Sequence, residues 1–175
     1  MRRRELIAGV GALGVIGAAG ATVYGNFDPF DSGDPIEPVE LPRLDASGSP
    51  PGTETVPEPD SVTFVSVFAT WCGSCQAKMD PLGVVASTVS EAVQFISVTN
   101  EPVGQTIDKS AVVDWWIEHD GNWPVAHDDE LELTRQVDAP GVPYSIVIDQ
   151  NNVLIWADAG YKTAEEIRQQ IEKAR

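Results

Sequence analysis

Residues 62–75 read VTFVSVFATWCGSC, and this stretch decides the fold. Residues 62–69 are an almost continuous run of β-branched and aromatic side chains, which predicts a strand buried on both faces of a sheet. The run ends just before Cys72 and Cys75, which form a Cys-x-x-Cys pair. The sequence therefore predicts that a buried strand carries two thiols to one edge of a sheet.

The residues after the cysteine pair show helical spacing. Met79, Leu82, Ala86 and Val89 recur on one face, which predicts a helix over residues 74–91 with a kink at Pro81. The later predicted elements are a strand at 93–99, a helix at 108–119, a strand at 123–126, a helix at 130–137, and strands at 144–149 and 153–159. Strands that alternate with helices indicate an α/β fold, with a mixed central sheet and helices on both faces.

Two local motifs define the last elements. Residues 150–152, Gln-Asn-Asn, join the last two predicted strands and favour an antiparallel hairpin, because asparagine tolerates positive φ. Thr163 and Glu166 form a capping box that begins a final helix. The residues of that helix expected to face inward are Ala164, Ile167, Ile171 and Ala174.

The N-terminal segment is typical of export. Three arginines at residues 2–4 precede an uncharged, glycine- and alanine-rich stretch at 6–23, and residues 3–7 resemble the twin-arginine export motif. Eighteen residues also suffice to span a bilayer. Residues 1–25 are therefore predicted to be a signal peptide or an uncleaved membrane anchor, and the domain is expected outside the cell membrane, anchored or secreted.

A proline-rich region follows this segment. Residues 26–60 contain eight of the thirteen prolines and show little periodicity, which is typical of a tether. We assign residues 26–37 to an acidic linker and 38–175 to the folded domain. Within the proline-rich region, residues 39–44 and 54–56 are predicted to form a short edge hairpin, since proline confines strands to edges.

The chain is strongly acidic. Without residues 1–25 it carries 26 acidic and 8 basic residues, a balance that repels nucleic acid and anionic lipid headgroups. Only four lysines occur. We hypothesise an origin in concentrated salt, where acidic surfaces stay hydrated; an ordinary acidic secreted domain is the alternative.

The cysteine motif points to redox chemistry. Both cysteines lie in one motif, so no second pair can build a disulfide framework. Disulfide exchange requires a thiolate, and the amide groups and dipole at a helix start stabilise one on Cys72. Cys75 is placed to attack a mixed disulfide on Cys72 and release the substrate. Gly73 and Ser74 keep the turn small and are expected to leave Cys72 exposed.

Other uses of the two thiolates have less support. A zinc site would need His119 and His127, whose spacing is unusual for zinc ligands, and each is expected at the surface or at a helix C-terminus. Cys-x-x-Cys thiolates also suit Cu(I), so a copper chaperone or a binding module remains an alternative, although Met1 and Met79 are the only methionines. Peroxide reduction would need a dedicated pocket that the sequence does not identify. We expect no metal and no cofactor.

The residues around the motif resemble a known family. Residues 68–75, FATWCGSC, are similar to the active-site signature of thioredoxin-like proteins of the TlpA/ResA type. The resemblance continues in the same order through residues 121–125, Asp128 and residues 141–143, and it covers roughly residues 37–175. It implies a thioredoxin-like fold and thiol-disulfide exchange.

The resemblance also assigns roles to residues beyond the cysteines. It implies that Pro143 is a cis-proline beside the disulfide, that the Val142 backbone pairs with an extended substrate segment, and that Trp71 covers the site. The alternatives are a trans Pro143 that begins an edge strand and a Trp71 packed in the core. The helix with Trp115 and Trp116 looks like the extra element of this branch of the family.

Three departures from the family pattern limit these expectations. Ser66 occupies the strand position where thioredoxin has a buried acid, Ser74 replaces a proline, and Pro81 lies one residue later than in the family. Lys78 and Asp80 lie close to the motif, but the sequence assigns neither a catalytic role.

These features predict a monomeric protein-disulfide oxidoreductase that acts on the thiols and disulfides of exported proteins. Reduction of apocytochromes c and oxidation or isomerisation of other substrates are both open, because the sequence does not decide the direction of electron flow. Either direction needs a partner, and a membrane electron donor or acceptor is expected.

Overall fold

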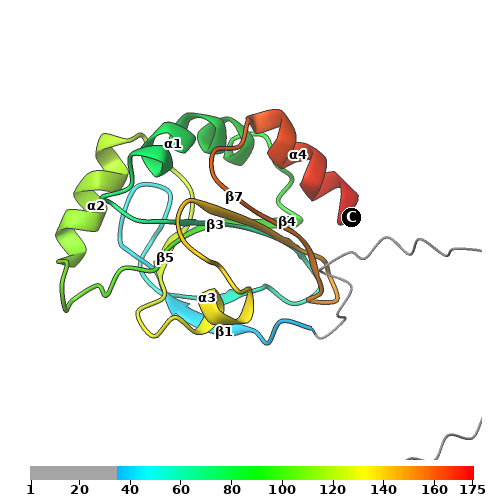
Figure 1. Ribbon diagram of the computed structural model, residues 1–175, viewed down its shortest axis with the longest axis horizontal. Coiled ribbons are helices and arrows are strands. Elements are labelled where there is room, and N and C mark those ends of the chain that lie inside the picture. The colour runs from blue at the N-terminus through cyan, green and yellow to red at the C-terminus, as the bar shows by residue number, and fades with distance from the viewer. Residues whose placement is uncertain (1–34) are drawn as a thin grey trace, which may run out of the picture.

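The computed structural model describes residues 35–175, so the predicted signal or anchor and residues 26–34 of the linker lie outside the described residues. Its centre is a five-stranded sheet with the order β5-β4-β3-β6-β7 (Figure 1). The strands are β3 (Val62–Phe68), β4 (Val93–Thr99), β5 (Val125–His127), β6 (Tyr144–Ile148) and β7 (Leu154–Ala159). β3, β4 and β5 are parallel, whereas β6 and β7 run antiparallel to their neighbours. The predicted mixed sheet is confirmed.

The central strand β3 is buried throughout, as its sequence predicts. Alternate side chains point to opposite faces. Phe64 packs in one core cluster, where its ring stacks on Phe95 with centroids 4.7 Å apart. Val65 packs in the cluster on the other face. Both faces of the sheet must therefore be covered.

Three helices cover the first face: α1 (Gly73–Ala86), α2 (Lys109–Glu118) and α4 (Ala164–Lys173) (Figure 1). Trp116 of α2 is fully buried, and its ring meets the edge of Trp123 at 4.7 Å. The capping box of Thr163 and Glu166 is present at the start of α4. Ile167 of α4 is buried in the same cluster, so the prediction for the final helix is confirmed.

A short helix and a separate sheet cover the second face. The helix is α3 (Glu132–Gln136), and the sheet consists of the antiparallel strands β1 (Val39–Pro42) and β2 (Thr53–Val56). The predicted hairpin forms, and its Leu41 and Val56 pack in the second core cluster. Ile36, within the range assigned to the linker, is also buried there.

Some element ends differ from the sequence prediction. α1 ends at Ala86, because the hydroxyls of Ser87 and Thr88 bond the carbonyl of Val84 and compete with the helical pattern. α2 spans Lys109–Glu118, with Asp108 and His119, the ends of the predicted helix, as its cap residues.

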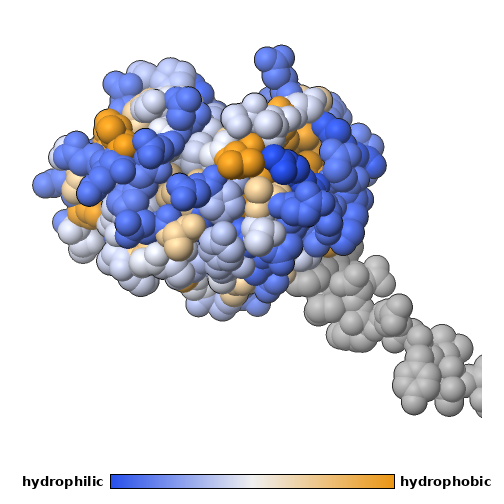
Figure 2. Space-filling view, turned by 90° about the horizontal axis from the view of Figure 1, so that it is seen from above, coloured by the Kyte–Doolittle hydropathy of each residue, from blue (hydrophilic) through white to orange (hydrophobic). Residues whose placement is uncertain are grey.

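The surface on the side of the helices is largely hydrophilic, with a few separate hydrophobic patches (Figure 2). The large apolar side chains that are exposed are Trp71, Val84, Ile117, Ile155 and Tyr161. Among the helices of residues 35–175, none has both the length and the apolar character to cross a membrane.

Candidate active site

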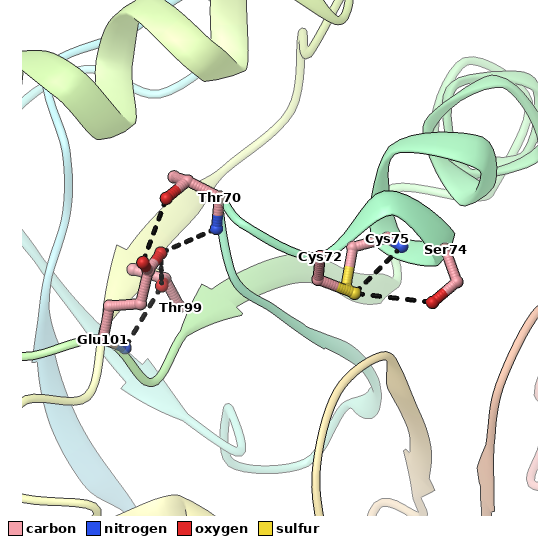
Figure 3. Close-up of a disulfide and its surroundings, with 6 residues drawn as sticks. All are labelled: Thr70, Cys72, Ser74, Cys75, Thr99 and Glu101. Atoms are coloured by element: carbon pink, nitrogen blue, oxygen red, sulfur yellow. Dashed lines mark hydrogen bonds between the residues drawn. A yellow bond between two sulfur atoms is a disulfide. The ribbon is translucent and has the colours of Figure 1, made fainter.

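Cys72 lies at the N-cap of α1, directly after β3 and its short loop. Its Sγ accepts a hydrogen bond from the Cys75 N–H at 3.1 Å and lies 3.5 Å from the Ser74 Oγ (Figure 3). The free N–H groups and the dipole at a helix start favour negative charge on such a sulfur. The predicted position of Cys72 is confirmed.

The two cysteines are joined as a disulfide, with their Cα atoms 5.2 Å apart. Cys72 is 6% exposed and Cys75 is 2% exposed. The expected exposure of Cys72 is therefore wrong for the disulfide form, because its side chain folds back over the first turn of α1. Gly73 and Ser74 are exposed beside it. Cys72 remains the more exposed residue of the pair.

Trp71 precedes Cys72 and is 74% exposed. Core packing, the alternative that the sequence left open, is excluded by this exposure. The indole lies on the surface next to the disulfide, where it is available to contact another molecule.

Pro143 follows a cis peptide bond after Val142, as the family resemblance implied. The bond lies just before β6, which pairs with β3 at Tyr144 and Val67, so it lies near the end of β3 that leads to the cysteines. The Pro143 carbonyl accepts the Gly160 N–H at 2.9 Å. The sheet thus brings Val142 and Pro143 to the edge that carries Cys72.

Glu101 is a site residue that the sequence did not reveal. Its buried carboxylate accepts the Thr70 N–H at 2.7 Å, the Thr70 hydroxyl at 3.0 Å and the Thr99 hydroxyl at 3.2 Å (Figure 3). Glu101 thereby fixes the loop between β3 and Cys72. One signal was available: β3 and β4 are parallel neighbours, so the residues that follow them meet at one edge of the sheet.

Lys78 is a second residue whose role the sequence did not reveal. It lies on the buried face of α1 and is 1% exposed, and its Nζ donates to the Ser145 Oγ at 2.5 Å. Burial, and to a smaller extent Lys162, lowers its pKa to about 7, and Asp158 opposes the shift. The available signal was its spacing, three residues after Cys75 on the apolar side of the predicted helix.

Ser66 is buried in the central strand, opposite Ser97 on β4 and Ser145 on β6. The strand position of the thioredoxin acid is therefore occupied by a hydroxyl within a row of serines. Trp123 donates from its indole N–H to the Ser97 Oγ at 2.9 Å in this row.

Of the remaining residues singled out from the sequence, His119 lines a pocket together with Gly73 and Gln76 of α1. His119 is the C-cap residue of α2, as predicted, and its Nδ1 lies 2.7 Å from the Trp115 carbonyl. His127 is buried, with Nδ1 2.7 Å from Asp129 Oδ1. Its expected surface position is wrong, because β5 pairs with β4 and carries it inward.

Asp128 accepts three hydrogen bonds at the start of α3. Residues 35–175 contain no cluster of three or more metal-binding side chains.

The fold and the site define a class of protein. A mixed sheet, a Cys-x-x-Cys disulfide at a helix start and a cis-proline before the neighbouring strand together characterise a thioredoxin-like thiol-disulfide oxidoreductase. The chain belongs to the Redoxin family, whose model matches residues 31–173.

Solved structures share the fold at low sequence identity. StoA from Bacillus subtilis is 15% identical with a TM-score of 0.66, and the match covers 77% of this chain and 96% of StoA. The exposed lipoprotein thioredoxin Etrx1 from Streptococcus pneumoniae is 18% identical with a TM-score of 0.67, covering 78% of this chain and 99% of Etrx1. A DsbF homologue from Corynebacterium diphtheriae is 17% identical with a TM-score of 0.67, covering 82% and 90%. A comparison with curated proteins gave no match.

Proposed function

We propose that this protein exchanges a dithiol and a disulfide with exported protein substrates, with Cys72 attacking and Cys75 resolving. The observation that carries the proposal is the position of Cys72. It is the N-cap of α1, its sulfur accepts the Cys75 N–H, and it is the more accessible cysteine. A sulfur in this position is stabilised as a thiolate, which is the species that attacks disulfides.

The reaction proceeds through a mixed disulfide. The Cys72 thiolate attacks one sulfur of a substrate disulfide, forms a bond to it and expels the other sulfur as a thiolate. Cys75 then loses its proton and attacks the Cys72 sulfur, which closes the protein disulfide and releases the second substrate thiolate. Two electrons pass from the dithiol to the substrate, and the reverse sequence oxidises a substrate dithiol.

The surroundings of Cys72 support recognition of an extended segment. Trp71 presents an exposed ring, and Gly73 and Ser74 are exposed beside Cys72. We assign the backbone of Val142, before Pro143, to pairing with the substrate main chain, and Trp71 to covering the bound segment. Both assignments follow the family resemblance and the position of the cis bond.

The setting of the reaction follows from the N-terminal sequence. The twin-arginine-like segment favours export to the outer side of the cell membrane, where we expect a monomer, and Etrx1, one structural relative, is described as an exposed lipoprotein. A TlpA/ResA-type role, such as reduction of apocytochromes c, would require a membrane electron donor; an oxidase would require an acceptor. A reduction potential near about −270 mV would favour the reductase, and one near about −120 mV the oxidase.

Two variants test the proposal. Cys75→Ser should accumulate covalent complexes with substrate proteins, because the mixed disulfide on Cys72 can no longer be resolved. Cys72→Ser should form no such complexes and should not reduce insulin. A Cys72→Ser variant that retains activity would contradict the proposal. Partners that bind both variants equally and without a covalent bond would favour a binding module instead.

A further inference from the structure

Lys78 is a buried amine without an ionic partner. Lysine is almost never fully buried unless it is paired, yet Lys78 is 1% exposed and takes part in none of the salt bridges found in residues 35–175. Its Nζ donates one hydrogen bond, to the hydroxyl of Ser145. Nothing in this contact requires a positive charge, so the group is poised to lose its proton.

The position of Lys78 connects it to the resolving thiol. Cys75 and Lys78 lie three residues apart on the buried face of α1, and Cβ atoms at this spacing are about 5–6 Å apart. The four-carbon stem of a lysine is long enough to bring its amine from Ser145 to the Cys75 sulfur. Ser66 faces the same space from β3, in register with Ser145, and supplies no carboxyl group. Lys78 is thus the ionisable group that shares the buried face of α1 with Cys75.

The local charges keep both forms of the amine accessible. Burial is the largest cause that lowers the pKa of Lys78 to about 7. Lys162, before α4, contributes to this lowering, and Asp158 on β7 opposes it. These two groups form an ion pair with Nζ and Oδ2 3.2 Å apart. Near neutral pH the amine can therefore both accept and return a proton.

We propose that Lys78 exchanges the proton of Cys75 during resolution of the mixed disulfide; the inference rests on the function proposed above. The neutral amine accepts the Cys75 thiol proton while the Cys75 sulfur attacks the Cys72 sulfur. The bond between Cys72 and the substrate breaks, and its electron pair leaves with the substrate thiolate. The lysine ammonium then returns its proton to solvent or to that thiolate. In the oxidising direction the ammonium protonates Cys75 as it leaves.

The attack by Cys72 and the resolution by Cys75 can be timed separately with a small aromatic disulfide. Reduced protein mixed with dithiobis(nitrobenzoate) should release one chromophore as Cys72 attacks and a second as Cys75 resolves. In the native protein the rate of the second release should rise with pH and level off above about 7, following Lys78. In Lys78→Met, which keeps the volume of the side chain, the second release should slow by about tenfold or more at neutral pH. The inflection near pH 7 in the pH profile of the second release should disappear in this variant. The rate of the first release should be unchanged.

Further variants distinguish proton exchange by Lys78 from a role as a fixed positive charge. Lys78→Arg keeps a cation that cannot lose its proton, so it should be as slow as Lys78→Met. Lys162→Met should move the inflection to higher pH, and Asp158→Asn should move it to lower pH, in line with their effects on Lys78. Lys173→Met, in the exposed last turn of α4, is the matched control and should change neither release.

Three outcomes would overturn the inference. A second release with unchanged rate and pH profile in Lys78→Met would show that Cys75 loses its proton elsewhere. Equal slowing of both releases would show that Lys78 supports the site as a whole. A second release as fast in Lys78→Arg as in the native protein would show that Lys78 acts as a fixed positive charge. Absence of a first release in the native protein would instead refute the proposed attack by Cys72, and with it the basis of this inference.

Discussion

At the scale of single residues, position in the fold sets the chemistry of identical side chains. Cys72 and Cys75 are three residues apart, but only Cys72 lies at the N-cap and accepts a backbone hydrogen bond. Among the lysines, Lys78 is fully buried and Lys173 is exposed, and burial is the main cause that lowers the pKa of Lys78. These differences come from burial and hydrogen bonding, not from residue type.

The buried amine of Lys78 should make stability depend on pH. Folding lowers its pKa from 10.5 to about 7, so the unfolded chain holds this proton more tightly between those values. The penalty for burying the charge is fully present below about 7 and disappears as pH rises to 10.5. At about 1.4 kcal/mol per pKa unit, the change is on the order of 5 kcal/mol.

Urea unfolding of the oxidised protein across this pH range, compared with Lys78→Met, checks this prediction. The free energy of unfolding of the native protein should rise with pH as this penalty disappears, whereas Lys78→Met lacks the amine. The difference in free energy of unfolding between the two proteins should therefore shrink as pH rises. A difference that stays constant with pH would contradict the lowered pKa of Lys78.

Glu101 should stabilise the loop that leads to Cys72. Glu101→Ala would leave the Thr70 N–H and the hydroxyls of Thr70 and Thr99 without their acceptor, at a cost of about 1–3 kcal/mol. Urea unfolding of the oxidised protein measures this loss. Glu91→Ala, at an exposed glutamate before β4, is the control and should change stability little. Equal unfolding midpoints for the two variants would show that the Glu101 contacts add nothing.

The sequence revealed some of these residues and not others, for a physical reason. Cys72, Cys75 and Pro143 belong to local motifs that can be identified along the chain. The roles of Glu101 and Lys78 depend on partners in other segments, Thr70 in the loop after β3 and Ser145 on β6, which are 31 and 67 residues away in sequence. Their function appears only once the sheet has brought these partners together.

At the scale of elements, local sequence signals predicted which helices and strands form better than they predicted where each one ends. The continuous apolar run predicted β3, and the capping box predicted the start of α4. The end of α1 depends instead on hydroxyls that bond a helix carbonyl, and the helical pattern of apolar residues gave no sign of them. The hairpin of β1 and β2 was predicted, but its packing beneath the central sheet depends on contacts that are distant in sequence.

The capping box offers a test at this scale. The Thr163 hydroxyl accepts the Glu166 N–H at 3.2 Å, and the Thr163 N–H donates to the Glu166 carboxylate at 2.7 Å. Thr163→Ala removes the hydroxyl cap and should destabilise the protein by about 1 kcal/mol. Thr163→Ser keeps the cap and should lie close to the native protein in thermal unfolding. Identical melting of the Ala and Ser variants would exclude a contribution from the cap.

At the scale of the whole molecule, charge is the dominant property. The chain has a formal net charge of −16, and the face seen in Figure 2 is largely hydrophilic with separate apolar patches. Such a charge destabilises the compact state through self-repulsion, which salt screens. Under the hypothesis of a saline origin, the thermal unfolding midpoint should keep rising into molar KCl. A midpoint that stops rising once ordinary screening is complete would favour an ordinary acidic secreted domain.

The central claim concerns the charge state of one sulfur in the folded molecule, and alkylation of the reduced protein tests it most directly. The rate of reaction with iodoacetamide is measured against pH, and mass spectrometry identifies the modified cysteine. The account predicts modification at Cys72, with an inflection clearly below the ordinary thiol value of about 8.5, while Cys75 stays protected. An inflection at or above that value, or modification of Cys75 first, would contradict it.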